Sequence, residues 1–353
     1  MAQSITGNKA QHQTYLTILN IVACLGVVML HTNVTFWSHP TGSAWLSATL
    51  IETLMYWPVP IFFMITGATL LEYRDRYSTP VFMKKRFVKT FIPFIFWSIV
   101  AFYAQLLWQA MEGQEIKQWL PNIIDIFNYK YKPIYWFFIP LFAIYLSMPL
   151  LNLLKGRWRL IRYLILYAFL SYSMLPFLQQ AFNLQLDSYW RAPVVAGYIL
   201  YVLLGYYLSR TQQNKKARIV IYALGLVGLT LHFCGTYFLT PNYGGSETIN
   251  TLFKGYLNFP CVLYSVAIFV FFKHINYAGL QNKRHAPIIN SLHASTLGIY
   301  LIHIYVIDIL TLSLHINQLS LTWRLLGPLL IFLLSFLLVQ LLKRLPLLKS
   351  TVP

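Results

Sequence analysis

The 353-residue sequence has few charged residues, especially acidic ones. Charged side chains make up 10% of the chain and hydrophobic ones 58%, and nine Asp and Glu stand against 27 Lys and Arg. Soluble globular domains carry about a quarter of their residues as charged side chains, so this composition indicates a polytopic membrane protein. The net charge of +18 does not indicate nucleic-acid binding, because the basic residues fall in short clusters between apolar runs.

The sequence is also poor in cysteine. Cys24, Cys234 and Cys261 all fall inside apolar runs and far apart, which excludes a disulfide framework and a CxxC metal site. We therefore expect them to be packing residues and expect no bound metal. Residues 1–14 do not resemble a cleavable signal peptide, so the apolar run after them is predicted to remain as a membrane span.

Long hydrophobic runs recur along the whole chain. A transmembrane helix needs about 20 predominantly apolar residues. Ten stretches qualify, near residues 15–36, 46–71, 90–110, 134–153, 160–180, 193–209, 219–239, 253–272, 288–311 and 322–342. No connection is long enough for an independent soluble core. The sequence therefore predicts one all-α membrane bundle over residues 1–353, with short tails at 1–14 and 343–353.

The basic residues orient this bundle. With the N-terminus in the cytoplasm, 21 Lys and Arg fall on the cytoplasmic side and six on the outer side, which accounts for all 27. Lys and Arg are enriched in cytoplasmic loops of membrane proteins. Ten spans with both termini cytoplasmic satisfy this rule.

The second span contains residues that disturb a helix. Pro58 precedes the segment "PIFFMITGATLL" at 60–71, which itself begins with Pro60 and contains Gly67. Proline removes a backbone hydrogen bond and bends or breaks helices. We expect this helix to be bent or locally unwound where protein or a cavity covers it.

Three ionisable side chains share one depth near the outer face. His31, in "GVVMLHTNVTFW" at 26–37, and Glu52 each lie about five residues from the outer ends of adjacent helices. A carboxylate at this depth suits orientation of an imidazole as general base. His303, in "SLHASTLGIYLIH" at 291–303, reaches the same level, with Thr296 on nearly the same face.

Ionisable groups in a membrane are functional candidates by default. The alternative is a structural polar residue that reaches interfacial water or hydrogen-bonds a neighbouring helix. For His303, and for Asp308 in the same predicted span, we give this alternative the same weight as a functional role.

These segments together resemble the acyltransferase-3 family of membrane O-acyltransferases. The matching stretches are "LNIVACLGVVMLH" at 19–31, "PIFFMITGATLL" at 60–71, "KKRFVKTFIPF" at 84–94, "YWFFIPLFAIYLSMPLL" at 135–151, "LYVLLGYYLS" at 200–209 and "SLHASTLGIYLIH" at 291–303. The resemblance implies a ten-helix enzyme of the bacterial cell membrane. It implies a cytoplasmic acyl-CoA donor, usually acetyl-CoA, with no permanently bound cofactor, and a carbohydrate or lipid-linked acceptor at the outer face.

The resemblance also assigns roles to individual residues. His31 matches the proposed catalytic histidine of the family, and Asn20 would line the path of the donor. Arg86 and Lys89 match basic positions that could neutralise coenzyme A phosphates. Many members carry Arg where this chain has Asn20, and a basic residue where it has Thr90. For Asn20 the alternative is a helix-packing contact, and for Arg86 and Lys89 it is the ordinary basic character of a cytoplasmic loop.

The outer segment 111–133 mixes aromatic side chains with a carboxylate. It holds Trp119, Phe127, Tyr129, Tyr131 and Asp125. Such a mixture suits sugar binding, although an interfacial aromatic belt explains any single ring.

Two functions of other classes compete with the enzyme. A polysaccharide transporter or flippase is consistent with ten helices and a bent second span, but it predicts a repeat and charged residues near the midplane. A ligand-binding membrane protein with a degenerate acyltransferase site is consistent with Asn20 in place of the common Arg.

Overall fold

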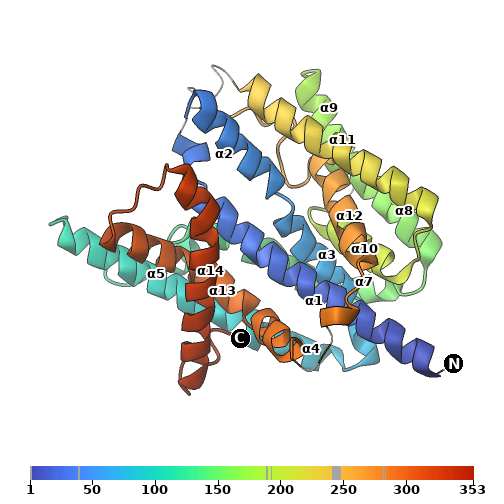
Figure 1. The fold of residues 1–353 in the computed structure, drawn as a ribbon, viewed down its shortest axis with the longest axis horizontal. Coiled ribbons are helices and arrows are strands. Elements are labelled where there is room, and N and C mark those ends of the chain that lie inside the picture. The colour runs from blue at the N-terminus through green and yellow to red at the C-terminus, as the bar shows by residue number, and fades with distance from the viewer. Residues whose placement is uncertain are drawn as a thin grey trace.

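The computed structural model describes residues 2–38, 40–187, 190, 191, 193–240, 248–280, 282 and 284–353, with residues 2–13 as backbone alone. Within these ranges the chain forms helices joined by turns and irregular segments, and it forms no strand. The α-helices are α1 (Ala2–Thr32), α2 (Gly42–Leu54), α3 (Pro58–Leu70), α4 (Thr79–Arg86), α5 (Ile92–Met111), α6 (Ile123–Phe127), α7 (Phe138–Leu151), α8 (Trp158–Phe169), α9 (Leu175–Ala181), α10 (Ile199–Arg210), α11 (Lys215–Leu239), α12 (Phe259–His274), α13 (Ala286–Ser313) and α14 (Leu321–Arg344). Figure 1 shows them as one bundle.

Eight helical stretches of the described chain are long and apolar enough to cross a membrane. They are Thr14–Ser38, Gly42–Asp75, Thr79–Met111, Pro133–Leu154, Trp158–Ala181, Lys215–Leu239, Ala286–Ser313 and Leu321–Arg344. The prediction of a polytopic helical membrane bundle is confirmed. Five of these stretches include short non-α segments, among them the π-helical segments Phe87–Phe91 and Leu170–Met174 and the 3₁₀ segment Pro133–Phe137 before α7.

The remaining two predicted spans contain shorter helices than expected. α10 has 12 residues and α12 has 16, against the roughly 20 that a full crossing needs. The sequence could not anticipate this, because the residues around both helices are as apolar as a span. α10 buries nine of its 12 residues inside the bundle. Most of its length is therefore covered by protein rather than lipid, which is the condition under which a short helix is tolerated at membrane depth.

The predicted break in the second span is confirmed. α2 ends at Leu54, and α3 begins at Pro58, in the first-turn position where proline costs no hydrogen bond. α3 then packs very closely on α10. A Cβ atom on Gly67 would lie 1.9 Å from the carbonyl oxygen of Val202, and one on Gly205 would lie 2.0 Å from that of Met64. Small residues at a crossing let membrane helices approach backbone to backbone.

α1 runs through the centre of the bundle and packs against α3, α12, α13 and α14. The two chain ends and α4 lie in the lower half of Figure 1, and α2 and α9 in the upper half, which agrees with the predicted sidedness of the connections. The residues after α14 fold back on the bundle. The indole nitrogen of Trp97 donates to the carbonyl oxygen of Thr351 at 2.9 Å, and Val352 is fully buried. The predicted tail at 343–353 is therefore packed rather than extended.

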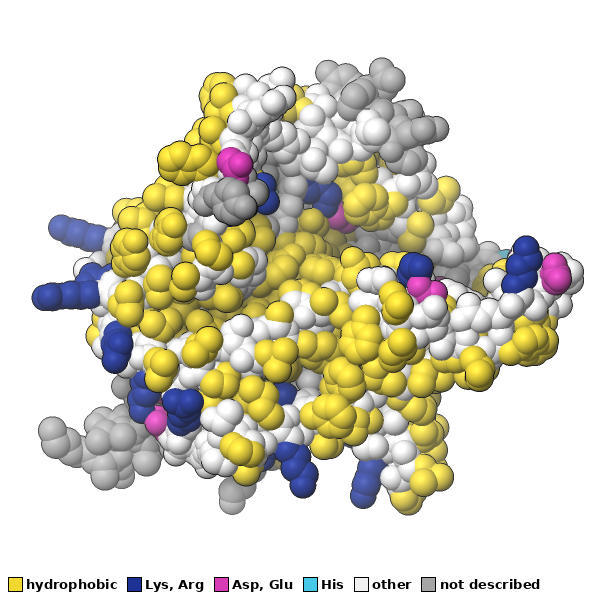
Figure 2. All heavy atoms as spheres, turned by 180° about the vertical axis from the view of Figure 1, so that it is seen from behind, with side chains coloured by type: hydrophobic (Ala, Val, Ile, Leu, Met, Phe, Trp, Pro, Cys, Tyr) yellow, Lys and Arg dark blue, Asp and Glu magenta, His cyan; other side chains and the backbone are white. Residues whose placement is uncertain are grey.

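Large apolar side chains cover much of the outside of the bundle. Leu325, Leu326, Leu329, Leu330 and Leu333 on α14 are all between 45% and 61% exposed. Figure 2 shows hydrophobic side chains spread over one face, with Lys and Arg concentrated along its edges and a hollow entering its upper half. An exposed apolar surface of this extent fits the hydrocarbon of a bilayer.

Candidate active site

The two predicted histidines lie in direct contact between α1 and α13. Nδ1 of His31 lies 2.7 Å from Nε2 of His303, with the ring centroids 5.0 Å apart and the ring planes inclined by only 17°. These helices pack together because α1 is central to the bundle, although the two residues are 272 positions apart. The prediction that His31 and His303 share one depth is confirmed.

The partners of His303 define the tautomers of the pair. Nδ1 of His303 faces the carbonyl oxygens of Ile299 at 3.1 Å and Tyr300 at 2.8 Å, and carbonyl oxygens only accept hydrogen bonds. Nδ1 therefore carries the proton, and in neutral His303 Nε2 is an acceptor. It follows that His31 donates through Nδ1–H and keeps the lone pair of its own Nε2. A histidine held in this tautomer is an oriented base.

Exposure distinguishes the two members of the pair. His303 is fully buried, with the ring of Tyr300 centred 5.9 Å away, whereas His31 is partly exposed. The ammonium group of Lys132 interacts electrostatically with both imidazoles. His31 is thus the accessible member of the pair, and the buried His303 holds its orientation.

The predicted contact between Glu52 and His31 is wrong. Glu52 instead accepts a hydrogen bond from the ammonium group of Lys254 at 2.8 Å, and the two side chains are 4% and 5% exposed. The Lys254 nitrogen also lies 3.7 Å from the centre of the Tyr56 ring. Because the buried carboxylate already has a cation as partner, it does not need the imidazole. The sequence analysis did not single out Lys254. Its place on the outer side, where Lys and Arg are scarce, was a signal that could have marked it.

Asn20 also joins α1 to α13, on the α4 side of the histidine pair. Its side-chain nitrogen donates to Oγ1 of Thr296 at 2.8 Å and contacts Nδ1 of His293 at 3.0 Å. Eleven residues separate Asn20 from His31, a rise of about 16 Å along a helix. Asn20 therefore lies between the basic side of the bundle and the pair, where the predicted donor path would run.

The basic residues Arg86 and Lys89 lie near the start of the third span. The guanidinium of Arg86 is centred 5.8 Å from the ring of Phe82 and 5.7 Å from that of Tyr145, and its buried Nε has no hydrogen-bond partner within the described chain. Lys89 is exposed, and its positive charge repels that of Lys343 on α14. This arrangement leaves positive charge available to an anion such as a phosphate.

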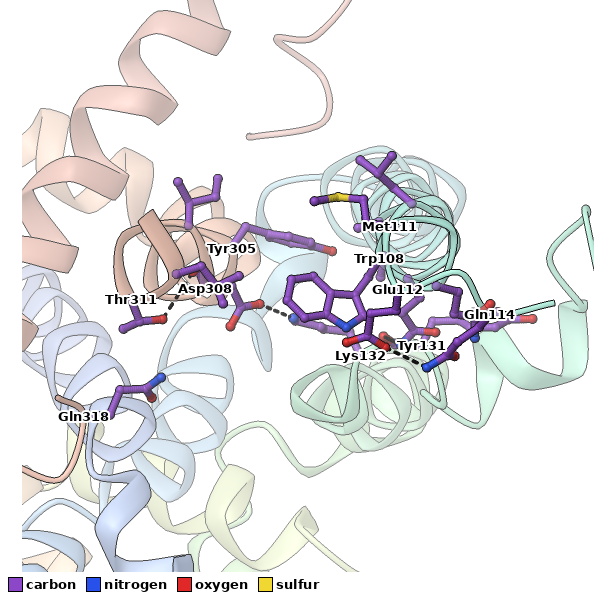
Figure 3. A pocket seen from close by; sticks show the side chains of 17 residues that line it. Trp108, Met111, Glu112, Gln114, Tyr131, Lys132, Tyr305, Asp308, Thr311 and Gln318 are labelled. Carbon is purple, nitrogen blue, oxygen red and sulfur yellow. Dashed lines mark hydrogen bonds and ion pairs between the residues drawn. The ribbon is translucent and has the colours of Figure 1, made fainter. Parts of the chain in front are cut away.

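A cavity of about 750 Å³ opens beside the outer ends of α5 and α13 (Figure 3). Lys132 and Asp308 meet in its wall at 2.8 Å, and Tyr131 and Tyr305 line it. Of the predicted sugar-binding residues in segment 111–133, only Tyr131 contributes to the cavity. Trp119, Phe127, Tyr129 and Asp125 lie outside its lining.

The fold and the paired histidines define a multi-pass helical membrane protein with two hydrogen-bonded imidazoles between α1 and α13. The chain belongs to the acyltransferase-3 family, because the family's sequence profile, an acyltransferase domain, matches residues 13–342. The protein is accordingly a membrane acyltransferase. No curated protein and no solved structure matches the chain significantly.

Proposed function

We propose that the protein transfers an acetyl or other short acyl group from cytoplasmic acyl-CoA to a hydroxyl of an extracytoplasmic carbohydrate. The acceptor is a cell-surface glycan or its lipid-linked precursor, and the enzyme acts in a bacterial cell membrane. The main support is that His31 is partly exposed and that its Nε2 has no hydrogen-bond partner among the described residues, while Nδ1 is held by His303. A base so oriented is what acyl transfer to a weakly acidic hydroxyl requires.

The chemistry follows from this geometry. Nε2 of His31 removes the proton of the acceptor hydroxyl as its oxygen attacks the thioester carbonyl. The carbon–sulfur bond then breaks, coenzyme A leaves as a thiolate, and the proton held by His31 passes to the sulfur. Nδ1–H of His31 keeps its hydrogen bond to His303 throughout, so that the imidazolium formed in the transition state is stabilised where it arises.

The donor reaches this base from the opposite side of the membrane. Arg86 and Lys89 bind the phosphates of coenzyme A, and the pantetheine arm passes Asn20 toward His31. The positive charge of Arg86 and Lys89 on the cytoplasmic side supports the phosphate contacts. The place of Asn20 on α1, between that side and the histidine pair, supports the path of the arm. Acyl-CoA is a substrate in this proposal and not a resident cofactor.

The histidine pair favours the enzyme over the two alternatives. A flippase or a sensor with a degenerate site has no need of a base whose second nitrogen is held by a buried imidazole. The ionisable residues His31, Glu52 and His303 are also predicted to lie toward one face rather than at the midplane, unlike the charged residues of many transporters.

Labelled acetyl-CoA offered to purified protein with a glycan acceptor tests this function. Wild type should release coenzyme A and label the glycan, and His31→Ala should lose about a hundredfold to ten-thousandfold of the rate. His285→Ala is the matched control, because His285 lies at the opposite end of α13 and should leave the rate unchanged. Wild-type transfer by a properly inserted His31→Ala protein would contradict the proposal.

A further inference from the structure

The cavity beside α5 and α13 has the features of a ligand site. Its volume of about 750 Å³ lies within the usual range of roughly 300–1,000 Å³ for small-molecule sites. Two rigid helix ends and the segment before α7 form its walls. Figure 3 shows the indole of Trp108 among these side chains, with Asp308 and Tyr305 to one side and Gln114 to the other.

One lining residue links this cavity to the histidine pair. Lys132 lines it and interacts electrostatically with both His31 and His303. Tyr305, which also lines it, follows His303 by two residues on α13 and is held by a hydrogen bond to the carbonyl oxygen of Trp97 at 3.0 Å. Neither histidine lines the cavity, so the link between a bound ligand and the pair is the charge of Lys132.

The charges of the cavity do not suit an anion. Glu112, Lys132 and Asp308 are its charged lining residues. The one cation, Lys132, is neutralised by Asp308 at 2.8 Å, and Glu112 adds a further negative charge. A carboxylate or phosphate on the ligand would lose water without gaining an unpaired cation, which is costly.

The neutral lining residues suit a sugar. Trp108 is 45% exposed and offers its ring to the cavity, where the polarised C–H groups of a pyranose pack on the negative face of an indole. The amides of Gln105, Gln114 and Gln318 and the carboxylate of Asp308 provide donors and acceptors for hydroxyl groups.

We infer that this cavity binds an uncharged saccharide unit of the acceptor and discriminates against acidic sugars. The assignment of the bound sugar as acceptor rests on the proposed function, whereas the binding itself does not. A lipid acyl chain is the competing occupant, because the cavity lies near the outer edge of the bundle. It would use the apolar side chains and ignore the charge pair.

Binding to an array of matched neutral and uronic-acid oligosaccharides tests the inference, with purified labelled protein as the probe. Wild type should favour the neutral members by at least about tenfold. Trp108→Ala should weaken that binding by about tenfold, the loss expected for one aromatic platform. Trp119→Ala is the matched control, because Trp119 is an exposed tryptophan of the same outer region that does not line the cavity.

A second variant tests the charge argument without removing packing. Asp308→Asn keeps the shape of the side chain but frees the ammonium of Lys132, so binding should shift toward the acidic oligosaccharides by about tenfold. Preference of wild type for acidic members, or binding that neither variant alters, would overturn the inference. Displacement by phospholipid, with no response to saccharide, would assign the cavity to an acyl chain instead.

The same preparations separate this inference from the proposed function. Release of coenzyme A from acetyl-CoA reports the donor half of the reaction. Saccharide binding without thioester turnover would support the cavity and contradict the acyltransferase mechanism. Turnover and transfer that Trp108→Ala leaves at the wild-type level would support the mechanism and contradict the cavity.

Discussion

Lys254 and Glu52, 202 positions apart in the sequence, form a buried ion pair with 2.8 Å between their nitrogen and oxygen atoms. The ammonium also lies over the ring of Tyr56, so the pair joins the end of α2 to the segment before α12. Removal of one partner leaves an uncompensated buried charge. Such changes cost about 3–5 kcal/mol, whereas replacement of both partners by apolar residues is often neutral.

We therefore predict that Glu52→Gln and Lys254→Met each lower the thermal stability of the protein strongly. The double variant Glu52→Leu with Lys254→Met should recover most of the loss. Unfolding in detergent followed by circular dichroism measures all three. If the single variants unfold at the wild-type temperature, the pair is not a stability element.

His303 is predicted to act as a positioning residue for His31. His303→Ala removes the acceptor of Nδ1–H and frees the imidazole to rotate, so the transfer rate should fall by at least tenfold with little change in the apparent KM for acyl-CoA. His303→Gln, which can still accept this hydrogen bond, should recover part of the rate.

The pH profile distinguishes this role from a packing role. Acyl transfer by wild type should fall at acidic pH, because an imidazolium cannot remove a proton. A positioning role predicts that His303→Ala moves the acidic limb of the profile, since the environment of His31 has changed. A uniformly lowered profile of unchanged shape would indicate a loss of packing alone.

The helical fold was largely predictable from the sequence. Eight of the ten predicted spans coincide with crossing-length helices, because a bilayer demands long apolar segments and punctuates them with basic loops. The two short helices, α10 and α12, were not predictable as such. Their length depends on burial by neighbouring helices, and composition alone does not reveal which apolar segments face protein.

The site was predictable in depth but not in pairing. Counting residues from the ends of the spans placed His31, Glu52 and His303 at one level, and two of the three are in contact. Which groups pair depends on how each helix is rotated and on loops far away in sequence. Lys254 reaches Glu52 from a loop 202 residues distant, and no local pattern indicates that contact.

The orientation of the bundle yields a direct prediction. The distribution of Lys and Arg places the segment around Arg76 in the cytoplasm. A cysteine at this position, in a variant without the three native cysteines, should react with an impermeant maleimide only after the cells are opened. A cysteine at the exposed residue Trp119 should react in intact cells and is the control. Labelling of the Arg76 position from outside would show that the topology, and with it the proposed donor side, is the reverse of the one predicted.

Lys89 is predicted to contribute to donor binding through charge. Lys89→Ala should raise the apparent KM for acetyl-CoA several-fold at low salt, and the effect should shrink as salt screens the phosphate charge. Lys216→Ala, which removes an exposed basic residue from the start of α11, is the control and should leave the KM unchanged. An equal response of both variants would assign Lys89 to the general basic character of this face.

Asn20 gives the last prediction, because its two possible roles have different consequences. Its hydrogen bond to Thr296 can be removed from either side, by Asn20→Leu or by Thr296→Val. Interhelical hydrogen bonds in membranes contribute about 0.6 kcal/mol on average, so both changes should lower the unfolding temperature slightly. If Asn20 also lines the donor path, Asn20→Leu should raise the apparent KM for acetyl-CoA well beyond the effect of Thr296→Val. Matching small changes in stability, with the KM unaffected by either variant, would make Asn20 a helix-packing residue and remove it from the donor path.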